Sequence, residues 1–352
     1  MPKFKCLVTG ACGFIGSHMV ELLAEHGHEV IATDVQSTIN AQEPIKKECV
    51  ISTKKVAKEL IPCDITSKKE VEKLPMDVDY VFHVASVFSY SAPWEVLYKV
   101  NVQGTINLLE AIRKSQGIKR FVLWGAGGVY GEPKPEYTPF TEETPPDPPN
   151  NYQRSKWFQE FTTMVYGKKY GIKYTILRPT TVYGIRQFYG GVDFLRTAHK
   201  AAVLGLPVNM NTHVPFVHVR DVCNMALYLA QRHEAENEVY NSNDDSKMTL
   251  IEVMRFIAAI YGKPFVVLPP APIGAIKDIL LFVAGIDAYI SQKVLKKQKG
   301  ILERDQIGMM NLDFLYSNEK VKSTGYKFLY PDPKEGLIEM AKWYKEGRYF
   351  DI

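Results

Sequence analysis

The sequence predicts an α/β fold in which a parallel, doubly wound β-sheet carries helices on both faces. Short apolar segments alternate with helical segments up to residue 179, which is typical of parallel strands joined by crossover helices. The apolar segments are continuous rather than alternating, as over residues 78–86, and this is typical of strands buried on both faces. The 352 residues are enough for this unit and a smaller second part.

Each element follows from its local pattern. The expected strands are residues 6–8, 29–33, 60–66, 78–86, 119–124 and 174–179. Helices are expected after residue 13, near Ser67, and over residues 96–114 and 152–170. Seven prolines between residues 133 and 149 exclude regular structure there and predict a loop over the site. Residues 216–222 and 238–241 are expected to return to the main sheet.

Three glycines at spacing three join the first strand to the first helix. Gly10 permits a sharp turn, Gly13 removes the Cβ that would keep a phosphate from the backbone, and Gly16 lets the helix pack close to the strand. The N–H groups that begin this helix, around Phe14 and Ile15, are free to bind a pyrophosphate at the positive end of the helix dipole. The pattern therefore predicts a dinucleotide site, the alternative being a simple turn.

Acidic residues follow the second and third expected strands. Asp34 lies 18 residues after Gly16, where a carboxylate is expected to bond ribose hydroxyls, the alternative being a turn residue. A carboxylate there repels a 2′-phosphate, which favours NAD over NADP. Asp64, with Ile65 beside it, is placed to bond the adenine amino group or to cap the helix that begins near Ser67.

Small residues end the fourth strand. Ala85 and Ser86 leave room for a cofactor to lie against the backbone. Asn101, in the helix that follows, is either a surface residue or a buried hydrogen-bonding group near the active site.

Tyr152 and Lys156 lie four residues apart at the start of a helix, so both point to one face. A phenol has a pKa of about 10 and is a poor base at neutral pH. A nearby ammonium, with a positive nicotinamide, is expected to lower that pKa by about 3 units, which requires roughly 4 kcal/mol. Tyr152 would then exchange a proton with a substrate oxygen during hydride transfer, and Lys156 would bond the nicotinamide ribose. The alternative is two ordinary helix residues.

As a set, these segments resemble the extended short-chain dehydrogenase/reductase family, in its NAD-dependent epimerase/dehydratase group. The matching segments are residues 9–16, 34, 64–65, 83–85, 101–105, 129–131, 152–156, 178–184 and 218–222. The resemblance implies a Rossmann-type NAD-binding domain over residues 1–182, with returning segments near 216–242. It implies a smaller substrate-binding part over 183–215 and 243–352, and a homodimer built on the 96–114 and 152–170 helices.

The resemblance also implies the residues of the site. Tyr152 and Lys156 are the implied catalytic residues, and Ala126 and Gly127 are implied to lie beside the substrate. The implied cofactor-binding residues are Gly10, Gly13, Phe14, Ile15, Gly16, Asp34, Asp64, Ile65, Val84, Ala85, Ser86, Asn101, Tyr152, Lys156, Pro179 and Thr181.

The chain departs from the family pattern in one turn. The family carries a Ser or Thr three residues before the Val of Val-Tyr-Gly, and its hydroxyl bonds the substrate oxygen. Ala126 stands there, and losing that bond raises the barrier by about 2–4 kcal/mol. Ser86 and Thr181 are candidate substitutes. Gly127 and Gly128 stand where dehydratases carry Asp-Glu, which argues against dehydration.

The substrate is indicated by residues outside these motifs. Sugar-nucleotide members carry an Arg for the diphosphate where this chain has Val214, and Arg186, Arg196 and Arg304 are the candidates to compensate. Residues 273–286 are expected to form either a core helix or an exposed helix beside a membrane or a lipid-like substrate. This apolar segment favours the 3β-hydroxysteroid dehydrogenase-like branch.

Three functions follow from these observations. The favoured one is an NAD-dependent oxidoreductase that transfers hydride between nicotinamide and a secondary alcohol or ketone of a largely apolar, sterol- or isoprenoid-like substrate. The alternative is an NAD-dependent sugar-nucleotide 4-epimerase. The third is a non-catalytic NAD-binding sensor, which Ala126 favours and the retained Tyr152 and Lys156 oppose.

The net charge and the cysteine spacing predict which partners the protein binds and in which cellular compartment it lies. The formal net charge of +4 comes from scattered lysines, so a nucleic-acid partner is not expected. The five cysteines form no C-x-x-C pair and show no metal-ligand spacing, which is typical of reduced thiols in the cytoplasm and predicts no metal. No apolar segment is long enough to span a bilayer, and the chain enters its first strand directly, without a signal peptide.

Overall fold

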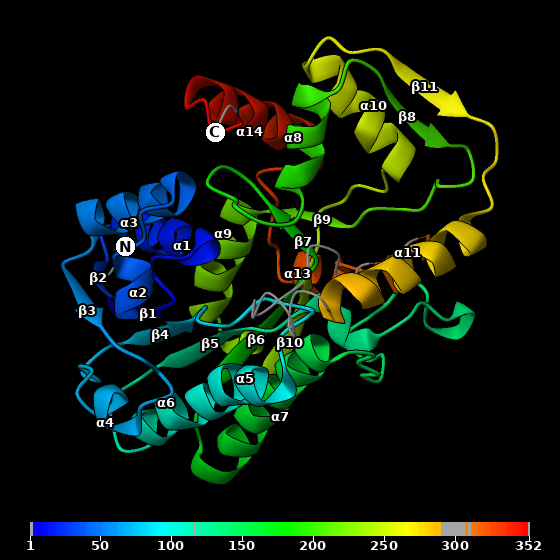
Figure 1. The fold of residues 1–352 in the computed structure, drawn as a ribbon. Coiled ribbons are helices and arrows are strands. Elements are labelled where there is room, and N and C mark those ends of the chain that lie inside the picture. The colour runs from blue at the N-terminus through cyan, green and yellow to red at the C-terminus, as the bar shows by residue number, and fades with distance from the viewer. Residues whose placement is uncertain (1–2, 116, 290–306, 309–310, 351–352) are drawn as a thin grey trace.

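The computed structural model describes residues 3–115, 117–289, 307–308 and 311–350. Its centre is a seven-stranded, wholly parallel sheet, which confirms the predicted fold class. The strand order is β10-β6-β5-β4-β1-β2-β3, so the winding direction reverses between β1 and β4 (Figure 1). Ligands of such sheets bind outside the carboxyl ends of the strands at this reversal.

The strands of the main sheet correspond to the six expected segments and one return. They are β1 (Lys5–Thr9), β2 (Glu29–Asp34), β3 (Glu59–Pro62), β4 (Tyr80–His83), β5 (Arg120–Trp124), β6 (Tyr174–Pro179) and β10 (Glu238–Ser242). β3 and β4 end several residues before the predicted ends. The chain after them is therefore irregular at the carboxyl edge of the sheet, where a ligand site is expected.

The predicted return of residues 216–222 to the main sheet is wrong. β9 (Phe216–His218) pairs instead with β7 (Thr181–Tyr183) in a separate two-stranded sheet. The helix α9 (Val219–Ala230) begins at once, because the imidazole of His218 accepts the N–H of Arg220 and caps it. The other predicted return is confirmed, since β10 pairs with β6.

Helices cover both faces of the sheet (Figure 1). On one face lie α1 (Phe14–Glu25) and α9, with α3 (Pro44–Val56) packed on α1 and α2 (Gln36–Ile39) beside α3. On the other lie α6 (Gly104–Ile112) and α7 (Asn151–Tyr170), with α4 (Lys68–Val71) packed on α6 and α5 (Trp94–Leu97) on α7. A π-helical segment, Tyr98–Gln103, joins α5 to α6, so the expected single helix over 96–114 carries a π-bulge.

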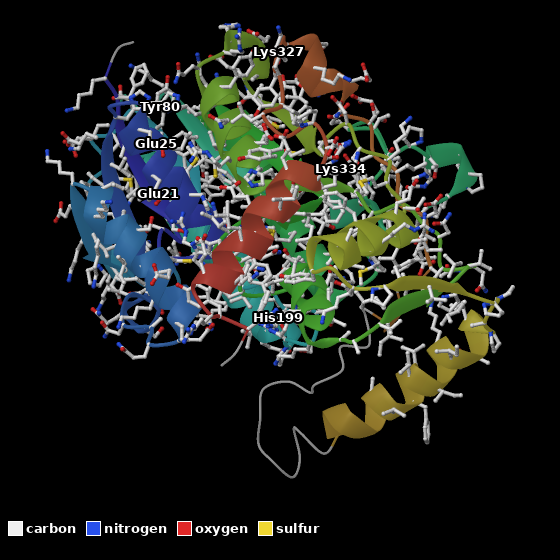
Figure 2. The ribbon with its side chains drawn as sticks, turned by 90° about the horizontal axis from the view of Figure 1, so that it is seen from above. Glu21, Glu25, Tyr80, His199, Lys327 and Lys334 are labelled. Atoms are coloured by element: carbon white, nitrogen blue, oxygen red, sulfur yellow. The ribbon has the colours of Figure 1, made fainter. Side chains whose placement is uncertain are left out.

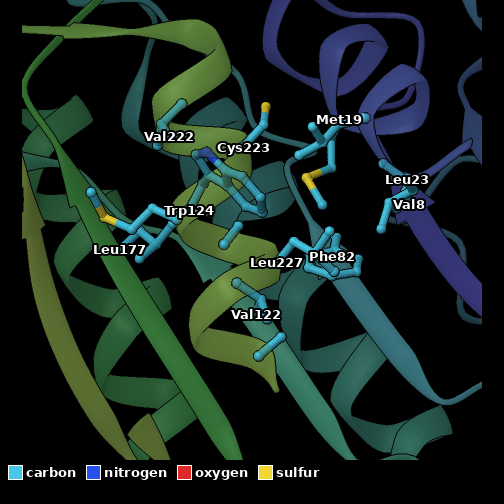
Figure 3. Packing of buried hydrophobic residues seen from close by; sticks show 14 of the residues in the cluster. Val8, Met19, Leu23, Phe82, Val122, Trp124, Leu177, Val222, Cys223 and Leu227 are labelled. Atoms are coloured by element: carbon cyan, nitrogen blue, oxygen red, sulfur yellow. The ribbon is translucent and has the colours of Figure 1, made fainter. Parts of the chain in front are cut away.

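Strand side chains alternate between two hydrophobic layers. Val8, Phe82, Val122 and Trp124 face α1 and α9, where Met19, Leu23, Val222 and Leu227 meet them (Figure 3). Leu7, Val81, Phe121 and Leu123 face the opposite layer with α6. All five cysteines are buried free thiols, as expected for a reducing compartment, and a cytoplasmic location stays a prediction.

A third hydrophobic cluster forms the second part of the molecule. It joins α8 (Val192–Lys200), α10 (Leu250–Ile260) and α14 (Lys334–Glu346), and β8 (Leu204–Pro207) pairs with β11 (Phe265–Leu268) beside them. The short helix α13 (Glu319–Ser323) packs on β10 of the main sheet. Single 3-10 turns occupy Gly127–Tyr130, Pro135–Tyr137 and His233–Ala235, and the second of these lies in the proline loop.

The apolar segment that begins at Ile273 exposes several of its described side chains, although Ile273 and Ala284 are buried. It forms α11 (Ile273–Tyr289), in which the side chains of Ile279 and Phe282 are 63% and 71% exposed. Figure 2 shows α11 set apart from the rest of the molecule. The expectation of a core helix is therefore wrong, whereas contact of this helix with a membrane or a lipid-like substrate stays a prediction. Among the helices that the structure describes, none is long and apolar enough to cross a membrane.

Candidate active site

The β1–α1 turn is held against the end of β4 by two glycines. Gly10 has a φ of +67°, and a Cβ on it would lie 2.7 Å from the Cα of Ala85. A Cβ on Gly16 would lie 1.9 Å from the carbonyl oxygen of Gly10. At Gly13 an added Cβ would meet only that same oxygen, at 3.2 Å. The turn therefore has no room for a side chain at Gly10 or Gly16, whereas it is less crowded at Gly13.

The start of α1 is free to bind an anion. Gly13 is its N-cap, and no side chain in the described ranges caps it. The first turn holds no acidic residue. The N–H groups of Phe14 and Ile15 have no partner within the helix at these positions, and the dipole adds positive potential.

Asp34 ends β2 with a fixed carboxylate. It accepts the N–H of Cys12 at 2.9 Å and that of Val35 at 2.8 Å, and burial raises its pKa. Because Cys12 belongs to the glycine turn, these bonds tie the carboxylate to the candidate pyrophosphate site. This open turn with an adjacent carboxylate fits a dinucleotide whose ribose hydroxyls are unmodified.

Two other expected residues have different surroundings from those predicted. The carboxylate of Asp64 accepts the N–H of Thr66 at 2.9 Å and does not cap α4, whose N-cap is Ser67. The capping expectation is therefore wrong, and the adenine contact stays a prediction. The side chain of Ile65 is 5% exposed and packs beneath Gly104, so Ile65 is a core residue.

Asn101 is fully buried in the π-helical segment. Its side-chain oxygen accepts the N–H of Val87 at 2.7 Å, and its amide donates to the carbonyl of Val87 at 3.2 Å and to Ser155 Oγ at 2.9 Å. Both polar atoms are engaged by the chain itself. Asn101 therefore positions the backbone after β4 against α7, and its expected contact with the cofactor stays a prediction.

Lys156 is buried at the carboxyl end of β5. Its ammonium donates to the carbonyl of Trp124 at 2.5 Å, to Gln159 Oε1 at 2.6 Å and to Ser86 Oγ at 3.4 Å. Burial lowers its pKa to about 7. Lys156 therefore reaches the end of β4 through Ser86, where a cofactor is expected to lie.

A chain of buried hydrogen bonds continues from Lys156 to β1. Gln159 donates to Thr105 Oγ1 at 2.9 Å, and Thr105 lies 2.8 Å from His83 Nε2. The other ring nitrogen of His83 lies 2.7 Å from Thr9 Oγ1. Burial, with the charge of Lys156, lowers the pKa of His83 to about 3, so this imidazole is neutral at physiological pH.

Tyr152 lies one helical turn before Lys156 in an aromatic enclosure. Its ring packs edge-on against Phe88 at 5.0 Å and Tyr90 at 5.4 Å between centroids. Burial, with the phenols of Tyr90 and Tyr189, raises the pKa of Tyr152 well above its usual value. The ammonium of Lys156 is directed at Trp124 and Gln159, and the lowering of the Tyr152 pKa that is expected from Lys156 together with a nicotinamide stays a prediction.

The turn after β5 is filled from a distant part of the chain. Tyr316, shortly before α13, donates to the carbonyl of Gly127 at 3.3 Å. A Cβ on Gly127 would lie 3.1 Å from the ring of Tyr316. Ala126, which precedes it, is extended and contributes no hydroxyl, as the sequence dictates.

A buried ion pair packs against Gly125 in this turn. Arg178 on β6 contacts Glu160 on α7 at 2.9 Å, and both side chains are almost fully buried. Arg178 also donates to the hydroxyl of Tyr130 at 2.9 Å. A Cβ on Gly125 would lie 2.2 Å from Glu160 Oε1, so the small residue is required above the pair.

The remaining expected residues lie at the same edge. Val84 donates its N–H to the carbonyl of Thr9 at 3.3 Å, Pro179 ends β6, and Thr181 begins β7. The candidate site thus gathers the ends of β1, β2, β4, β5 and β6 with the start of α7. Sequence reasoning missed Phe88, Tyr90, Ser155, Gln159 and Tyr316. Only Gln159 carried a local signal, since it lies three residues after Lys156 on the same helix.

The arginines expected to compensate for Val214 are engaged elsewhere. Arg186 pairs with Glu21, and Arg196 pairs with Asp193. Arg304 lies outside the described residues. The expected compensation is therefore not supported for Arg186 or Arg196.

An open glycine turn at the reversal of a parallel sheet, with a Tyr–Lys pair on α7 whose lysine reaches Ser86 at the same edge, is typical of Rossmann-fold enzymes that use a nicotinamide dinucleotide. The NAD dependent epimerase/dehydratase family model matches residues 6–242, and the chain belongs to this family. NAD is the cofactor.

Similar proteins act on UDP-sugars according to their names. A putative UDP-glucose 4-epimerase of Methanocaldococcus jannaschii is 34% identical over 279 residues, covering 73% of this chain and 85% of the relative. The UDP-glucose 4-epimerase of Thermotoga maritima, solved with UDP-glucose, superposes with a TM-score of 0.74 at 26% identity, covering 97% of this chain and 99% of that one. The UDP-glucose 4-epimerase of Thermus thermophilus, solved with NAD, has a TM-score of 0.71 at 27% identity over the same shares. These similarities do not confirm the 3β-hydroxysteroid dehydrogenase-like branch.

The glycine turn makes a stability prediction. Gly16→Ala places a methyl group 1.9 Å from a backbone oxygen, and we expect the free energy of unfolding to fall by about 1–3 kcal/mol, with loss of NAD binding. Urea unfolding and cofactor titration measure these effects. The control is Gly274→Ala on α11, where a Cβ meets no described atom within 4 Å and stability should hold. A Gly16→Ala protein as stable as the parent would contradict the close packing.

The pKa of Lys156 predicts a pH-dependent stability. Its folded pKa of about 7 lies below the value of about 10.4 in an unfolded chain. Between these pH values the unfolded chain holds a proton that the folded chain does not, so stability rises with pH. The free energy of unfolding in urea is measured for the parent and for Lys156→Met from pH 6 to pH 9.5. The stability of the parent relative to the variant should increase as the pH rises. A difference independent of pH would refute the burial of a titrating ammonium.

Proposed function

We propose that this protein is an NAD-dependent 4-epimerase of a nucleoside-diphosphate sugar, with Tyr152 as the acid and base and Lys156 as its partner. The observation that carries the proposal is the placement of Tyr152, a buried phenol one helical turn before Lys156, which reaches Ser86 at the end of β4. Similarity to UDP-glucose 4-epimerases supports the choice of substrate. The glycines at 127 and 128 favour epimerisation over dehydration, because an acid pair is absent from those positions.

NAD supplies the group that accepts hydride from the sugar and returns it. The candidate residues to hold it are the first turn of α1, Asp34 and the ends of β4 and β6. Tyr152 Oη takes the proton of the sugar hydroxyl as that carbon is oxidised, and gives it back when the carbon is reduced. Burial raises the pKa of the phenol, so a positive charge is needed for it to accept the proton. Lys156 is the cation on the same face of α7.

The enclosure of Tyr152 favours this chemistry. Phe88 and Tyr90 pack on its ring and limit the water that reaches its hydroxyl. With water excluded, the interaction between a phenolate and a nearby cation is stronger than it is in solvent.

A second candidate is the oxidation of an apolar secondary alcohol. It is favoured by the exposed apolar side chains of α11 and by Val214, where a diphosphate-binding arginine would stand. The same Tyr152 and Lys156 would serve this reaction, which differs in releasing reduced cofactor instead of reoxidising it on the same substrate.

One assay separates the two candidates. Purified protein is incubated with NAD and UDP-glucose or UDP-galactose, and the sugars are resolved by NMR. Interconversion without net NADH supports the epimerase. Absence of interconversion, with no UDP-sugar binding by calorimetry, overturns it. Net NADH absorbance with sterol or isoprenoid alcohols would then support the second candidate.

Replacing the catalytic phenol provides a prediction. We expect Tyr152→Phe to lower turnover by at least about 10²-fold with unchanged NAD affinity, because a proton-transfer group is lost while the ring stays. Turnover assays and cofactor titration measure the two effects. The control is Tyr170→Phe at the far end of the same helix, whose side chain is exposed. Equal activity of Tyr152→Phe and the parent would favour a non-catalytic NAD-binding protein.

The faces of α5, the π-helical segment and α7 support a homodimer. Phe158, Phe161 and Val165 lie on one face of α7 and are 40%, 50% and 42% exposed. Val96 and Tyr98 on the adjacent segment are also exposed. We propose that a second copy covers this apolar surface.

A charge placed on this face tests the dimer. We expect Phe161→Asp to yield a monomer at micromolar concentration, because burying an unpaired carboxylate is costly. Light scattering after size exclusion measures the mass. Phe282→Asp on α11 is the control and should leave the dimer intact. Dissociation by the control alone would assign the interface to α11.

A further inference from the structure

The turn after β5 lacks the hydroxyl that a second hydrogen bond to the substrate oxygen requires. Two hydroxyls from neighbouring strand ends are turned to other partners. Ser86 Oγ, one of the expected substitutes, accepts from Lys156 at 3.4 Å. Thr180 Oγ1 donates to the carbonyl of Ser242 at 3.3 Å, and it is the methyl group of Thr180 that faces Gly127. The hydroxyl of Thr180 is therefore directed away from Gly127 and the oxygen of Ser86 is bonded to Lys156, whereas Thr181 as a substitute stays a prediction.

Tyr316 brings a hydroxyl to this turn. Its Oη donates to the carbonyl of Gly127, the residue directly after Ala126, and its ring edge contacts Gly127. The bond length of 3.3 Å is long, since O–H···O bonds have a mode of about 2.7–2.8 Å. Breaking this bond in favour of a substrate oxygen therefore costs little.

The ring of Tyr316 is held firmly. It packs on Phe140 at 5.3 Å and Tyr130 at 6.0 Å between centroids. The backbone on both sides is bonded to Phe140, which donates to Leu315 at 2.8 Å and accepts from Ser317 at 2.9 Å. The hydroxyl is thus presented by a fixed side chain, as a preorganised donor must be.

Tyr316 and Tyr152 share a neighbour. Tyr90 packs on the ring of Tyr152 and raises the pKa of both Tyr152 and Tyr316, so its phenol lies near each of them. Burial is the main cause of the raised pKa of Tyr316, which keeps its proton at physiological pH. Tyr316 is therefore a donor and not a second base.

We infer that Tyr316 takes the place of the Ser or Thr missing at position 126 and donates a hydrogen bond to the substrate oxygen that Tyr152 deprotonates and reprotonates. The inference rests on the proposed function. Tyr316 loses no proton and forms no covalent bond. Its hydroxyl exchanges the carbonyl of Gly127 for the substrate oxygen, where it stabilises the negative charge that develops during proton and hydride transfer.

The test combines removal with rescue. Turnover is measured for the parent, Tyr316→Phe, Ala126→Ser and the double variant, with Tyr137→Phe in the proline loop as the matched control. We expect Tyr316→Phe to lower kcat by about 10²-fold with little change in KM, NAD affinity or Tm. Adding Ala126→Ser to Tyr316→Phe should raise kcat at least about tenfold above that of Tyr316→Phe alone, because the serine supplies a hydroxyl at the same turn. Tyr137→Phe should match the parent.

The outcomes separate the inference from the proposed function. A parent that neither interconverts nor binds UDP-sugars overturns the proposed function and the inference with it. An active parent with an unaffected Tyr316→Phe variant overturns the inference alone. If kcat of Tyr316→Phe falls and Ala126→Ser does not restore it, or if the fall accompanies a lower Tm, Tyr316 has a structural role. Either result also overturns the inference.

Discussion

The chain of buried hydrogen bonds from Lys156 to β1 is the constraint on which the site depends. It links Gln159, Thr105, His83 and Thr9, so α7, α6, β4 and β1 are held by one network. Each of these polar groups would be costly if left unpaired in the interior. The network therefore sets the rotation of α7 about its axis. That rotation directs Tyr152, one turn earlier, toward the end of β4.

The same network determines the electrostatics of the site. His83 is buried and its pKa is lowered to about 3, so it adds no charge beside Lys156. Lys156 has a pKa lowered to about 7 by burial, and its charge responds readily to a neighbouring ligand. Further along α7, Glu160 is neutralised by Arg178. The charges near Tyr152 are thus few, which makes the phenol sensitive to a bound cation.

The edge of the main sheet and the second part of the molecule favour different classes of substrate. The sheet edge carries the candidate site, in which Tyr316 contacts the turn at Gly127 and Ala126 contributes no hydroxyl. The second part carries an exposed apolar helix, α11, and no arginine at Val214. Family membership and similarity to UDP-glucose 4-epimerases outweigh the apolar segment, because hydrophobicity of a segment does not distinguish a substrate wall from an interface or a surface helix.

Local patterns in the sequence determined most of the fold. The glycines at 10, 13 and 16, the apolar strands and the helical spacing of Tyr152 and Lys156 each act over a few residues, so their structure could be predicted from neighbours in the chain. Burial at Asn101 was an open alternative, because its partners Val87 and Ser155 lie 14 and 54 residues away.

Tertiary structure alone decided the rest. Burial and the phenols of Tyr90 and Tyr189 raise the pKa of Tyr152, and neither phenol lies near it in the sequence. β9 pairs with β7 in a separate sheet instead of joining the main sheet, and this pairing connects segments that are far apart in the chain. Tyr316 meets Gly127 across 189 residues, a contact that no local pattern encodes. The sequence thus determined the sheet and the cofactor, whereas packing between distant segments decided which side chains surround Tyr152 and the turn at Gly127.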